Sequence, residues 1–575
     1  MLSAVTGALA VAMLAFAASP AAASYSAQVD AGGTLRITGN ADSDTLVLAT
    51  SADQLLLDVG ADGTSDFSFD LAAFTAIDVR AGGGDDRVQL LNSNVLPTKA
   101  ITVDGGGGND TLLGSNAPER LIGGSGNDFV DGNIGADTAD LGSGADTFQW
   151  DPGDGSDTVD GGSGRDALDF NGSNIGERMN VSANGDRVRF TRDVAAITMD
   201  LGGIEAVNVR ALGGADTVTV GDLRGTGLDT AAVDLAGFDG AGDEAADTVI
   251  ANGTPEADSA DVGSEEGSIV VDGLGAETRV AGGEQANDTV DVDTLGGDDG
   301  VTSGSGLAGP AAQVTVNGGE GTDTATYEGT SGDDTIGIAR NGTAVTTFAT
   351  GTALFNTNVE GLDVIGRGGA DTLSASNGIG ALTHLTLDGG NGDDTLRGGD
   401  GADLLLGGGG GDLVDGNIGA DTADLGGGAD RFQWDPGDGS DSVEGGSGND
   451  VLDFNGSNIG EHLEISANGG RLRFTRDVAA ITMDLNDFEG VVVRALGGAD
   501  TLTVDDLDGT GVKNVDVDLA GFGGVGDAAA DTVVANGSDG KDVVNVTRVL
   551  GQVVVKGLAA QLRLDGSEPA NDALR

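Results

Sequence analysis

The amino-acid sequence predicts an all-β protein: a right-handed parallel β-roll or β-helix solenoid, built as two tandem units. Three observations predict this fold. Glycine supplies 105 of the 575 residues, against a usual share of ~7 %. A nine-residue pattern of glycines, one acidic residue and one apolar residue recurs in two long runs. Elsewhere apolar and polar residues alternate as in half-buried strands, and helical periodicity is not evident after residue 24.

Residues 1–24 are expected to be a secretory signal peptide. Leu2 to Ala18 form an uncharged, mostly apolar run, and the small residues Ala21 to Ser24 follow with an A-x-A pattern, although no Lys or Arg precedes the run. The alternative is an uncleaved membrane anchor, but an anchor needs ~20 strongly apolar residues, and this run is shorter and rich in alanine. We therefore expect a secreted, extracellular or cell-surface protein, with no membrane insertion after signal removal.

The rest of the chain is a duplication. GNIGADTADLG at 132–142 returns at 416–426, and RFTRDVAAITMDL at 189–201 returns at 473–485, both with an offset of 284 residues. We call residues 25–307 repeat one and residues 308–575 repeat two, and we expect each to be a calcium-binding β-solenoid unit for the reasons that follow.

Each repeat contains a run of nonapeptides, at 105–169 and at 389–453. GGSGNDFVD and GGNGDDTLR show the pattern: glycine at positions one, two and four, aspartate at six and an apolar residue at eight. Position six is aspartate throughout, except at Glu119. Glycine permits backbone angles in the turn that other residues avoid. The last three residues are predicted to form a short strand whose central side chain points inward.

The position-six aspartates are candidate metal ligands. Two nonapeptides make one coil, so turns on the same side stack 18 residues apart. Carboxylates stacked ~5 Å apart repel one another without cations, and Ca²⁺ takes six to eight oxygen ligands. The alternative is a metal-free solenoid whose aspartates only shape the turns. The predicted metal ligands are Asp110, Asp128, Asp137, Asp146, Asp157, Asp166, Asp394, Asp403, Asp412, Asp421, Asp430, Asp441 and Asp450.

The pattern G-G-x-G-x-D-x-U-x resembles the haemolysin-type (RTX) calcium-binding repeats. The resemblance covers about 130 residues in the two runs. It implies a parallel β-roll that holds Ca²⁺ between stacked turns, with about five ions per run and about ten per chain. RTX proteins usually lack an N-terminal signal and leave the cell through a C-terminal one, so the signal-like segment of this chain departs from the family.

An insert interrupts each run, Trp150-Asp151-Pro152 in repeat one and Trp434-Asp435-Pro436 in repeat two. It lengthens the step between position-six residues, which predicts a bulged turn and a shift of register, so that Asp157 and Asp441 are the less secure ligands. The tryptophans are expected to cover the flank of the solenoid at this turn. Stacking on a sugar is the alternative.

Longer, looser modules surround the runs. VNVRALGGADTVTV at 207–220 keeps the glycine and aspartate of a nonapeptide, and GGADTLTVD at 497–505 is similar. We expect these modules to be further coils with longer turns. Asp216 and Asp500 within them are favoured as structural turn residues, with calcium binding as the alternative.

Composition and motifs exclude several functions. The net charge of −67 disfavours nucleic acid and anionic membranes as partners. The absence of cysteine excludes disulfides and thiol chemistry. Neither HExxH nor G-x-S-x-G is present, and the two histidines, His384 and His462, do not correspond in the duplication. The recurring arginines Arg189, Arg192, Arg473 and Arg476 are expected to pair with aspartates, with substrate binding as the alternative.

We therefore expect no catalytic residues. The predicted function is a secreted calcium ion-binding repeat protein that folds on Ca²⁺ binding and has a non-enzymatic structural or adhesive role, with an unidentified cell-surface or matrix polysaccharide or protein partner. The alternative is a β-helical carbohydrate-active enzyme or a polysaccharide-binding protein.

Overall fold

The computed structural model describes residues 24–307, 312–349 and 352–575. The predicted signal peptide lies outside these residues, except for Ser24. Over the described ranges the protein consists of β-strands and five short 3-10 turns, with no α-helix, which confirms the all-β prediction. The same ranges contain no helix with the length and apolarity that a membrane crossing requires.

The chain divides into two compact units. The first holds the described residues up to Asn171 together with 186–190 and 196–207; the second holds the described residues of 172–185, 191–195 and 208–575. This division falls inside repeat one, so the compact units differ from the sequence repeats. The boundary predicted at 307/308 separates the two repeats of the sequence, and it stays a prediction as a domain boundary.

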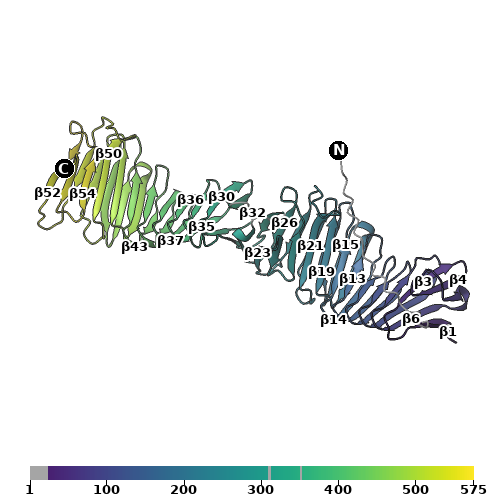
Figure 1. Cartoon of the computed structure of the whole chain (residues 1–575). Coiled ribbons are helices and arrows are strands. Elements are labelled where there is room, and N and C mark those ends of the chain that lie inside the picture. Colours follow the sequence, from purple (N-terminus) through teal and green to yellow (C-terminus); the bar gives the residue numbers. More distant parts are fainter. Residues whose placement is uncertain (1–23, 308–311, 350–351) are drawn as a thin grey trace, which may run out of the picture. The chain divides into compact units, whose positions relative to one another are not determined.

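Within the first compact unit, the strands of the nonapeptide run alternate between two sheets (Figure 1). Neighbouring strands of a sheet run parallel, because each coil returns the chain to the same side. One sheet contains β8 (Ala100–Gly107), β10 (Glu119–Ser125), β12 (Thr138–Gly144) and β14 (Thr158–Gly164), and the other contains β9 (Thr111–Leu113), β11 (Phe129–Asp131), β13 (Thr147–Trp150) and β15 (Ala167–Asn171).

The strand register confirms the predicted coil length. Leu121 lies opposite Val103 in the preceding coil and Ala139 in the following one, a step of 18 residues. The position-eight side chains point inward and form the core, so that one face of every strand is fully buried. These core residues are Leu112, Leu121, Val130, Ala139, Phe148, Val159 and Leu168.

The second compact unit repeats this arrangement around the run of repeat two. Leu405 lies opposite Leu387 and Ala423, and Val414 lies opposite Leu396. The strands are β35 (His384–Asn391), β36 (Thr395–Gly401), β37 (Leu404–Gly410), β38 (Leu413–Gly419), β39 (Thr422–Asp424), β40 (Gly427–Gly428), β41 (Arg431–Trp434), β42 (Ser442–Glu444), β43 (Ser447–Gly448) and β44 (Val451–Asn455).

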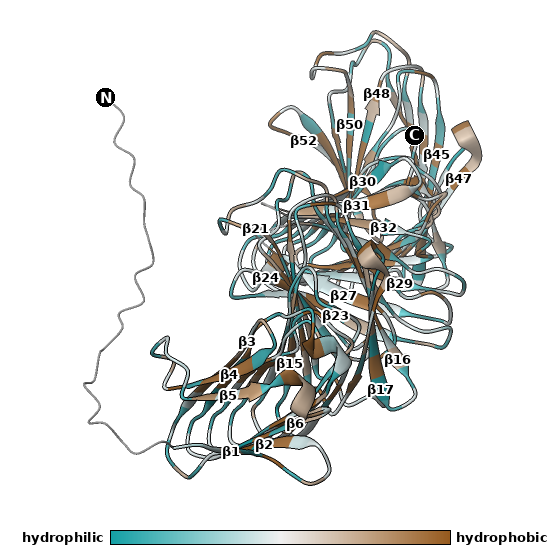
Figure 2. Ribbon diagram, turned by 90° about the vertical axis from the view of Figure 1, so that its right-hand side faces the viewer, coloured by the Kyte–Doolittle hydropathy of each residue, from teal (hydrophilic) through white to brown (hydrophobic). Residues whose placement is uncertain are grey.

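An antiparallel excursion follows the run of repeat two. β45 (His462–Asn468), β46 (Arg471–Arg476) and β47 (Ile481–Asn486) pair in sequence. The chain then returns to parallel coils through β48 (Gly490–Leu496), β49 (Thr501–Val504) and β50 (Asn514–Gly521). The looser modules therefore form further coils, as predicted. Figure 2 shows the alternation of hydrophobic and hydrophilic residues along the strands.

The two tryptophans lie in the core and not at the flank, which corrects the prediction. Trp150 and Trp434 end β13 and β41 and are fully buried. The ring of Trp150 stacks on Phe170, with 4.1 Å between ring centroids, and its Nε1 donates to the carbonyl of Gly155 at 2.8 Å. A buried indole is not available to stack on a sugar.

The insert also leaves the register intact. Phe148 lies opposite Leu168, so the coil step increases to 20 residues and pairing continues. The additional residues fold into a turn closed by hydrogen bonds between Asp151 and Asp154. The predicted shift of register is therefore wrong, because the extra length is accommodated outside the strands.

Candidate metal centre

The position-six aspartates of repeat one form two hydrogen-bonded ladders. In the first, the amide of Asp110 donates to Oδ1 of Asp128 at 2.7 Å, that of Asp128 to Asp146 at 2.7 Å, and that of Asp146 to Asp166 at 2.9 Å. All four residues are buried. Each carboxylate thus satisfies the backbone of the preceding coil.

The second ladder occupies the opposite turns. The amide of Glu119 donates to Asp137 Oδ1 at 2.7 Å, and that of Asp137 donates to Asp157 Oδ1 at 2.8 Å. Asp157 therefore keeps its place in the column after the tryptophan insert, contrary to the expected displacement.

The run of repeat two contains the same pair of ladders. Its rungs span 2.8 to 3.0 Å between amide nitrogen and Oδ1. One ladder joins Asp394, Asp412, Asp430 and Asp450, and the other joins Asp403, Asp421 and Asp441.

The second carboxylate oxygen, Oδ2, is the feature that points to a cation. In eleven of the thirteen predicted ligands it is buried and has no hydrogen-bond partner. A buried carboxylate oxygen without a partner is costly, and a bound cation removes that cost. The exceptions are Asp441 and Asp403, whose Oδ2 accepts the amide of Gly399 at 3.0 Å.

Position-one glycines allow a carboxylate and a backbone carbonyl of the next coil to approach the same part of the turn. A Cβ added at Gly407 would lie 2.7 Å from Asp412 Oδ2 and 2.5 Å from the carbonyl oxygen of Leu425 in the next coil. At Gly389 the same test gives 2.5 Å to Asp394 Oδ2 and 2.8 Å to the carbonyl oxygen of Gly407. A carboxylate and a carbonyl of the next coil therefore converge on one point, and both are oxygen donors of the kind that Ca²⁺ prefers.

Backbone oxygens must complete each site. Within the described ranges, no three histidine, aspartate or glutamate side chains come together as a metal-binding group. Each turn instead contributes one carboxylate, and glycine turns expose carbonyls around it. The residues present fit Ca²⁺, and the ion would supply positive charge between stacked turns.

Burial makes these carboxylates difficult to ionise in the absence of a cation. It raises the pKa of Asp128 and of Asp412 from 3.8 to about 6, with the charges of neighbouring ladder aspartates adding to the effect. Burial raises the pKa of Asp421 further, to about 8. The pKa of Asp137 also rises, because it is buried beside Glu119. A divalent cation reverses this by stabilising the charged form.

Both nonapeptide runs match a known protein family. A family profile described as the RTX calcium-binding nonapeptide repeat (4 copies) matches residues 102–118, 113–148, 153–174, 386–414, 398–432 and 437–458. These segments are RTX calcium-binding repeats. The resemblance inferred from the nonapeptide pattern is confirmed, and with it a calcium-binding β-roll.

Other comparisons add little to this. Among solved structures, the extracellular lipase LipA from Serratia marcescens is 14 % identical, with a TM-score of 0.11, and the match covers 85 % of this chain and 44 % of the lipase chain. This chain therefore spans less than half of the lipase, and a likeness at that TM-score supports no statement on fold or activity. No curated protein matches the chain.

The aspartate ladders extend beyond the matched segments. Some of these additional aspartates were not predicted as ligands from the sequence. Asp371 donates its amide to Asp394 Oδ1 at 2.7 Å, and its own Oδ2 is buried without a partner. Residues 318–326, GGEGTDTAT, carry the complete nonapeptide pattern, and Asp323 Oδ2 is likewise unpartnered. This isolated copy was detectable from its spacing alone. Asp216 and Asp500 also have an unpartnered Oδ2.

Some turns satisfy their carboxylate with protein groups. Glu461 accepts hydrogen bonds from the hydroxyl of Ser457 at 2.6 Å and from Nε of Arg476 at 2.8 Å, and both charged side chains are buried. Glu177 and Arg192 form the equivalent pair in repeat one. The ion pairs predicted for Arg192 and Arg476 exist, with glutamate as the partner and not aspartate. For Arg189 and Arg473 the prediction remains untested.

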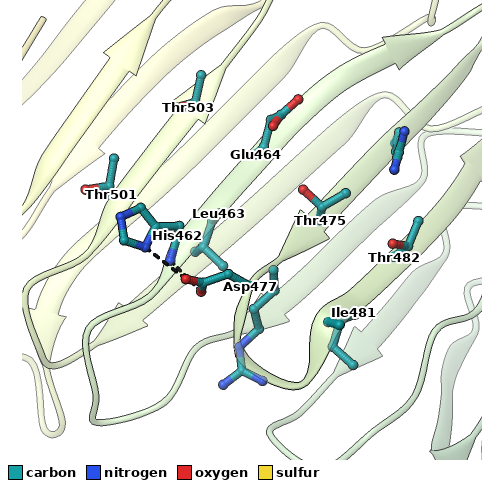
Figure 3. Close-up of a pocket in the computed structure, with 12 residues that line it drawn as sticks. His462, Leu463, Glu464, Thr475, Asp477, Ile481, Thr482, Thr501 and Thr503 are labelled. Atoms are coloured by element: carbon teal, nitrogen blue, oxygen red, sulfur yellow. Dashed lines mark hydrogen bonds and ion pairs between the residues drawn. The ribbon is translucent and has the colours of Figure 1, made fainter.

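A polar groove lies on the outer face of β45, β46, β47 and β49 (Figure 3). It has a volume of about 490 Å³. His462 Nδ1 lies 2.9 Å from Asp477 Oδ2 at its edge, and Glu464, Thr475 and Thr501 are among its lining residues. His462 is exposed, as is His384. The groove presents charged and hydroxyl groups without an aromatic platform.

Proposed function

We propose that this protein is a secreted, non-enzymatic calcium-binding repeat protein with a structural or adhesive role at the cell surface or in the surrounding matrix. The observation that carries the proposal is the row of buried Oδ2 atoms without partners, several of which lie close to a carbonyl of the next coil. Calcium is the cation that suits an all-oxygen site of this kind. The apolar, alanine-rich N-terminal segment supports secretion.

Calcium also links binding to folding in this proposal. The chain carries a net charge of −67, and its ladder carboxylates are buried next to one another. Each ion cancels two charges where repulsion is strongest, so binding free energy contributes to folding. A chain that stays unfolded at low calcium and folds at millimolar calcium is suited to export followed by assembly outside the cell.

The number of bound ions tests the proposal. Isothermal titration calorimetry and native mass spectrometry of the chain should give about ten Ca²⁺ per molecule, because each ion uses two stacked turns. Fewer than three ions would contradict a calcium-loaded β-roll and leave the metal-free solenoid as the better account.

The groove of Figure 3 supports a second candidate, polysaccharide binding. Its threonine hydroxyls and charged groups suit the hydroxyls of a sugar chain, but both tryptophans are buried. Incubation with acidic polysaccharides, with and without Ca²⁺, separates the candidates. Release of unsaturated or reducing ends would show an enzyme, whereas binding without cleavage would fit an adhesive role.

A further inference from the structure

One turn of repeat two carries its own cation, the guanidinium of Arg476. Its Nε donates to Oε1 of Glu461 at 2.8 Å, and its Nη2 donates to the same oxygen and to the hydroxyl of Ser457, the latter at 3.1 Å. The arginine and glutamate side chains are 4 % and 0 % exposed. The guanidinium carbon also lies 5.3 Å from the centroid of the Trp434 ring. A buried carboxylate is thus neutralised by a protein group.

Repeat one contains the same arrangement. Nε of Arg192 donates to Oε1 of Glu177 at 2.9 Å, and Nη2 donates to the hydroxyl of Ser173 at 3.1 Å. Both charged side chains are buried. The amide of Glu177 donates to Oδ1 of Asp216 at 2.7 Å, so this glutamate is itself the first member of a ladder.

The antiparallel excursion explains why a ladder begins here. The amide of Asp441 donates to Sδ of Met483 in β47 at 3.4 Å, and not to a carboxylate of the next coil. A new ladder begins at Glu461, whose amide donates to Oδ1 of Asp500 at 2.8 Å. Among the described residues, no amide of a preceding coil donates to Glu461. β46 of the excursion supplies Arg476 in its place.

Glu119 shows a similar turn without an arginine. Residues 114–119, GSNAPE, share with residues 456–461, GSNIGE, the serine whose hydroxyl donates to the glutamate. Glu119 is buried, and in the described part of the chain only its own turn donates to its carboxylate. Burial raises the pKa of Glu119. This carboxylate therefore needs a proton or a cation from solvent, whereas Glu461 does not.

The coils that contain the arginines also hold most of the large aromatic side chains of the core. Nine of the eleven largest fully buried aromatic side chains lie in residues 148–190 and 432–488. In repeat two, Phe454 contacts both Trp434 and Phe474, with 4.2 Å between ring centroids in each pair. Buried aromatic rings contribute large apolar areas, so these coils have a source of stability that does not depend on metal.

We propose that Arg476, and Arg192 in repeat one, act as resident cations that keep one coil of each repeat folded when calcium is absent. Each arginine donates hydrogen bonds where the amide of a preceding coil donates in the runs, and it supplies the positive charge that a bound ion would supply there. A guanidinium stays protonated at physiological pH and cannot dissociate from the chain. The inference rests on the proposed calcium dependence of the runs, which these coils do not share.

Hydrogen–deuterium exchange of the full chain at pH 7, after metal removal by a chelating resin, tests the proposal. We expect the amides of residues 462–486 and 178–202 to exchange at least about tenfold more slowly than those of residues 105–144 and 389–434 in the runs, because local stability differs along the chain. Added Ca²⁺ should then protect the runs. Arg476→Met should abolish the metal-free protection of residues 462–486 and leave that of residues 178–202, since coupling in a solenoid is between neighbours.

Two further variants serve as controls. Arg473→Met makes the same change at an exposed residue of the same strand and should leave the protection unchanged. Adding Glu461→Gln to Arg476→Met should recover part of it, because no uncompensated charge is then buried.

Two results would overturn the inference and leave the calcium proposal standing. One is rapid exchange of residues 462–486 in the metal-free, unaltered chain while Ca²⁺ still protects the runs. The other is metal-free protection of these residues that survives Arg476→Met. Slow exchange of the runs without metal would instead contradict their calcium dependence, and the inference would fail with it.

Discussion

The two oxygens of each ladder carboxylate have separate roles. Oδ1 accepts a backbone amide from the preceding coil and holds adjacent coils in register. In eleven of the thirteen predicted ligands Oδ2 is buried and lacks a partner. One side chain therefore serves both the fold and the metal. A change from aspartate to asparagine separates these roles, because the amide keeps an acceptor oxygen but loses the charge.

The first prediction concerns Asp128, which lies between Asp110 and Asp146 in the ladder. Asp128→Asn should remove about two of the ions bound by run one and leave run two intact, because coupling in a solenoid is between neighbours. Native mass spectrometry measures the loss. Asp186→Asn, at an exposed hairpin residue, is the matched control and should remove none. Equal losses from both runs would contradict the assignment of independent sites.

The second prediction concerns the buried pair of Glu461 and Arg476. Arg476→Met leaves a buried carboxylate without its countercharge, which costs about 3–5 kcal/mol in comparable pairs. Chemical denaturation of the calcium-bound chain should show this loss. Adding Glu461→Gln to the same chain should recover part of it, because the uncompensated charge is then absent. A single variant as stable as the unaltered protein would show that water reaches Glu461.

At the scale of the element, the position-one glycine lets two oxygen donors approach the turn closely. Gly407 does not have a positive φ, so alanine is compatible with its backbone, but the added Cβ would collide with Asp412 Oδ2 and with the carbonyl oxygen of Leu425 and displace both donors. The third prediction is that Gly407→Ala lowers the number of ions in run two by at least one. Gly470→Ala, where a Cβ meets no atom within 4 Å, should leave the count unchanged. Full occupancy in Gly407→Ala would place the ions elsewhere in the turn.

Some features of these elements could be predicted from the sequence and others could not. Within an uninterrupted run the nonapeptide period defines coil length and register, because inward and outward residues alternate and two nonapeptides make one coil of 18 residues. The position of Trp150 could not be inferred this way, since the insert to which it belongs could lengthen either the strand or the turn. The pairing of Glu461 with Arg476 spans 15 residues and an antiparallel excursion, and only the folded hairpin brings them together.

At the scale of the whole molecule, stability depends on the balance between buried carboxylates and the cations that neutralise them. The ladders of both runs follow the turns of their coils, where the aspartates are buried, in a chain with a net charge of −67. Aromatic residues make up only 3 % of the sequence. Calcium and protons therefore compete to neutralise the same carboxylates. The stability of the calcium-bound chain and that of the metal-free chain should consequently change with pH in opposite directions.

The fourth prediction follows from that competition. Burial raises the pKa of Asp128, Asp166, Asp412 and Asp450 from 3.8 to about 6. Because the pKa is higher in the folded state, protonation of these groups stabilises the metal-free fold. This stabilisation is complete below about pH 3.8 and is lost as the pH rises through 6. Metal-free chain should therefore gain β-structure and protection of residues 100–170 from proteolysis as the pH falls from 7 to 4.

In ~1–2 mM Ca²⁺, a concentration typical for weak extracellular sites, the trend should reverse. Calcium binds the ionised carboxylates, so order should increase as the pH rises through 6. Far-ultraviolet circular dichroism and limited proteolysis, with metal removed beforehand by a chelating resin, measure both curves on the same chain. A loss of β-structure in acid both with and without calcium would mean that the ladder carboxylates are ionised in the metal-free fold. Full protection of residues 100–170 at pH 7 without metal would mean that the hydrogen-bonded ladders alone stabilise the solenoid.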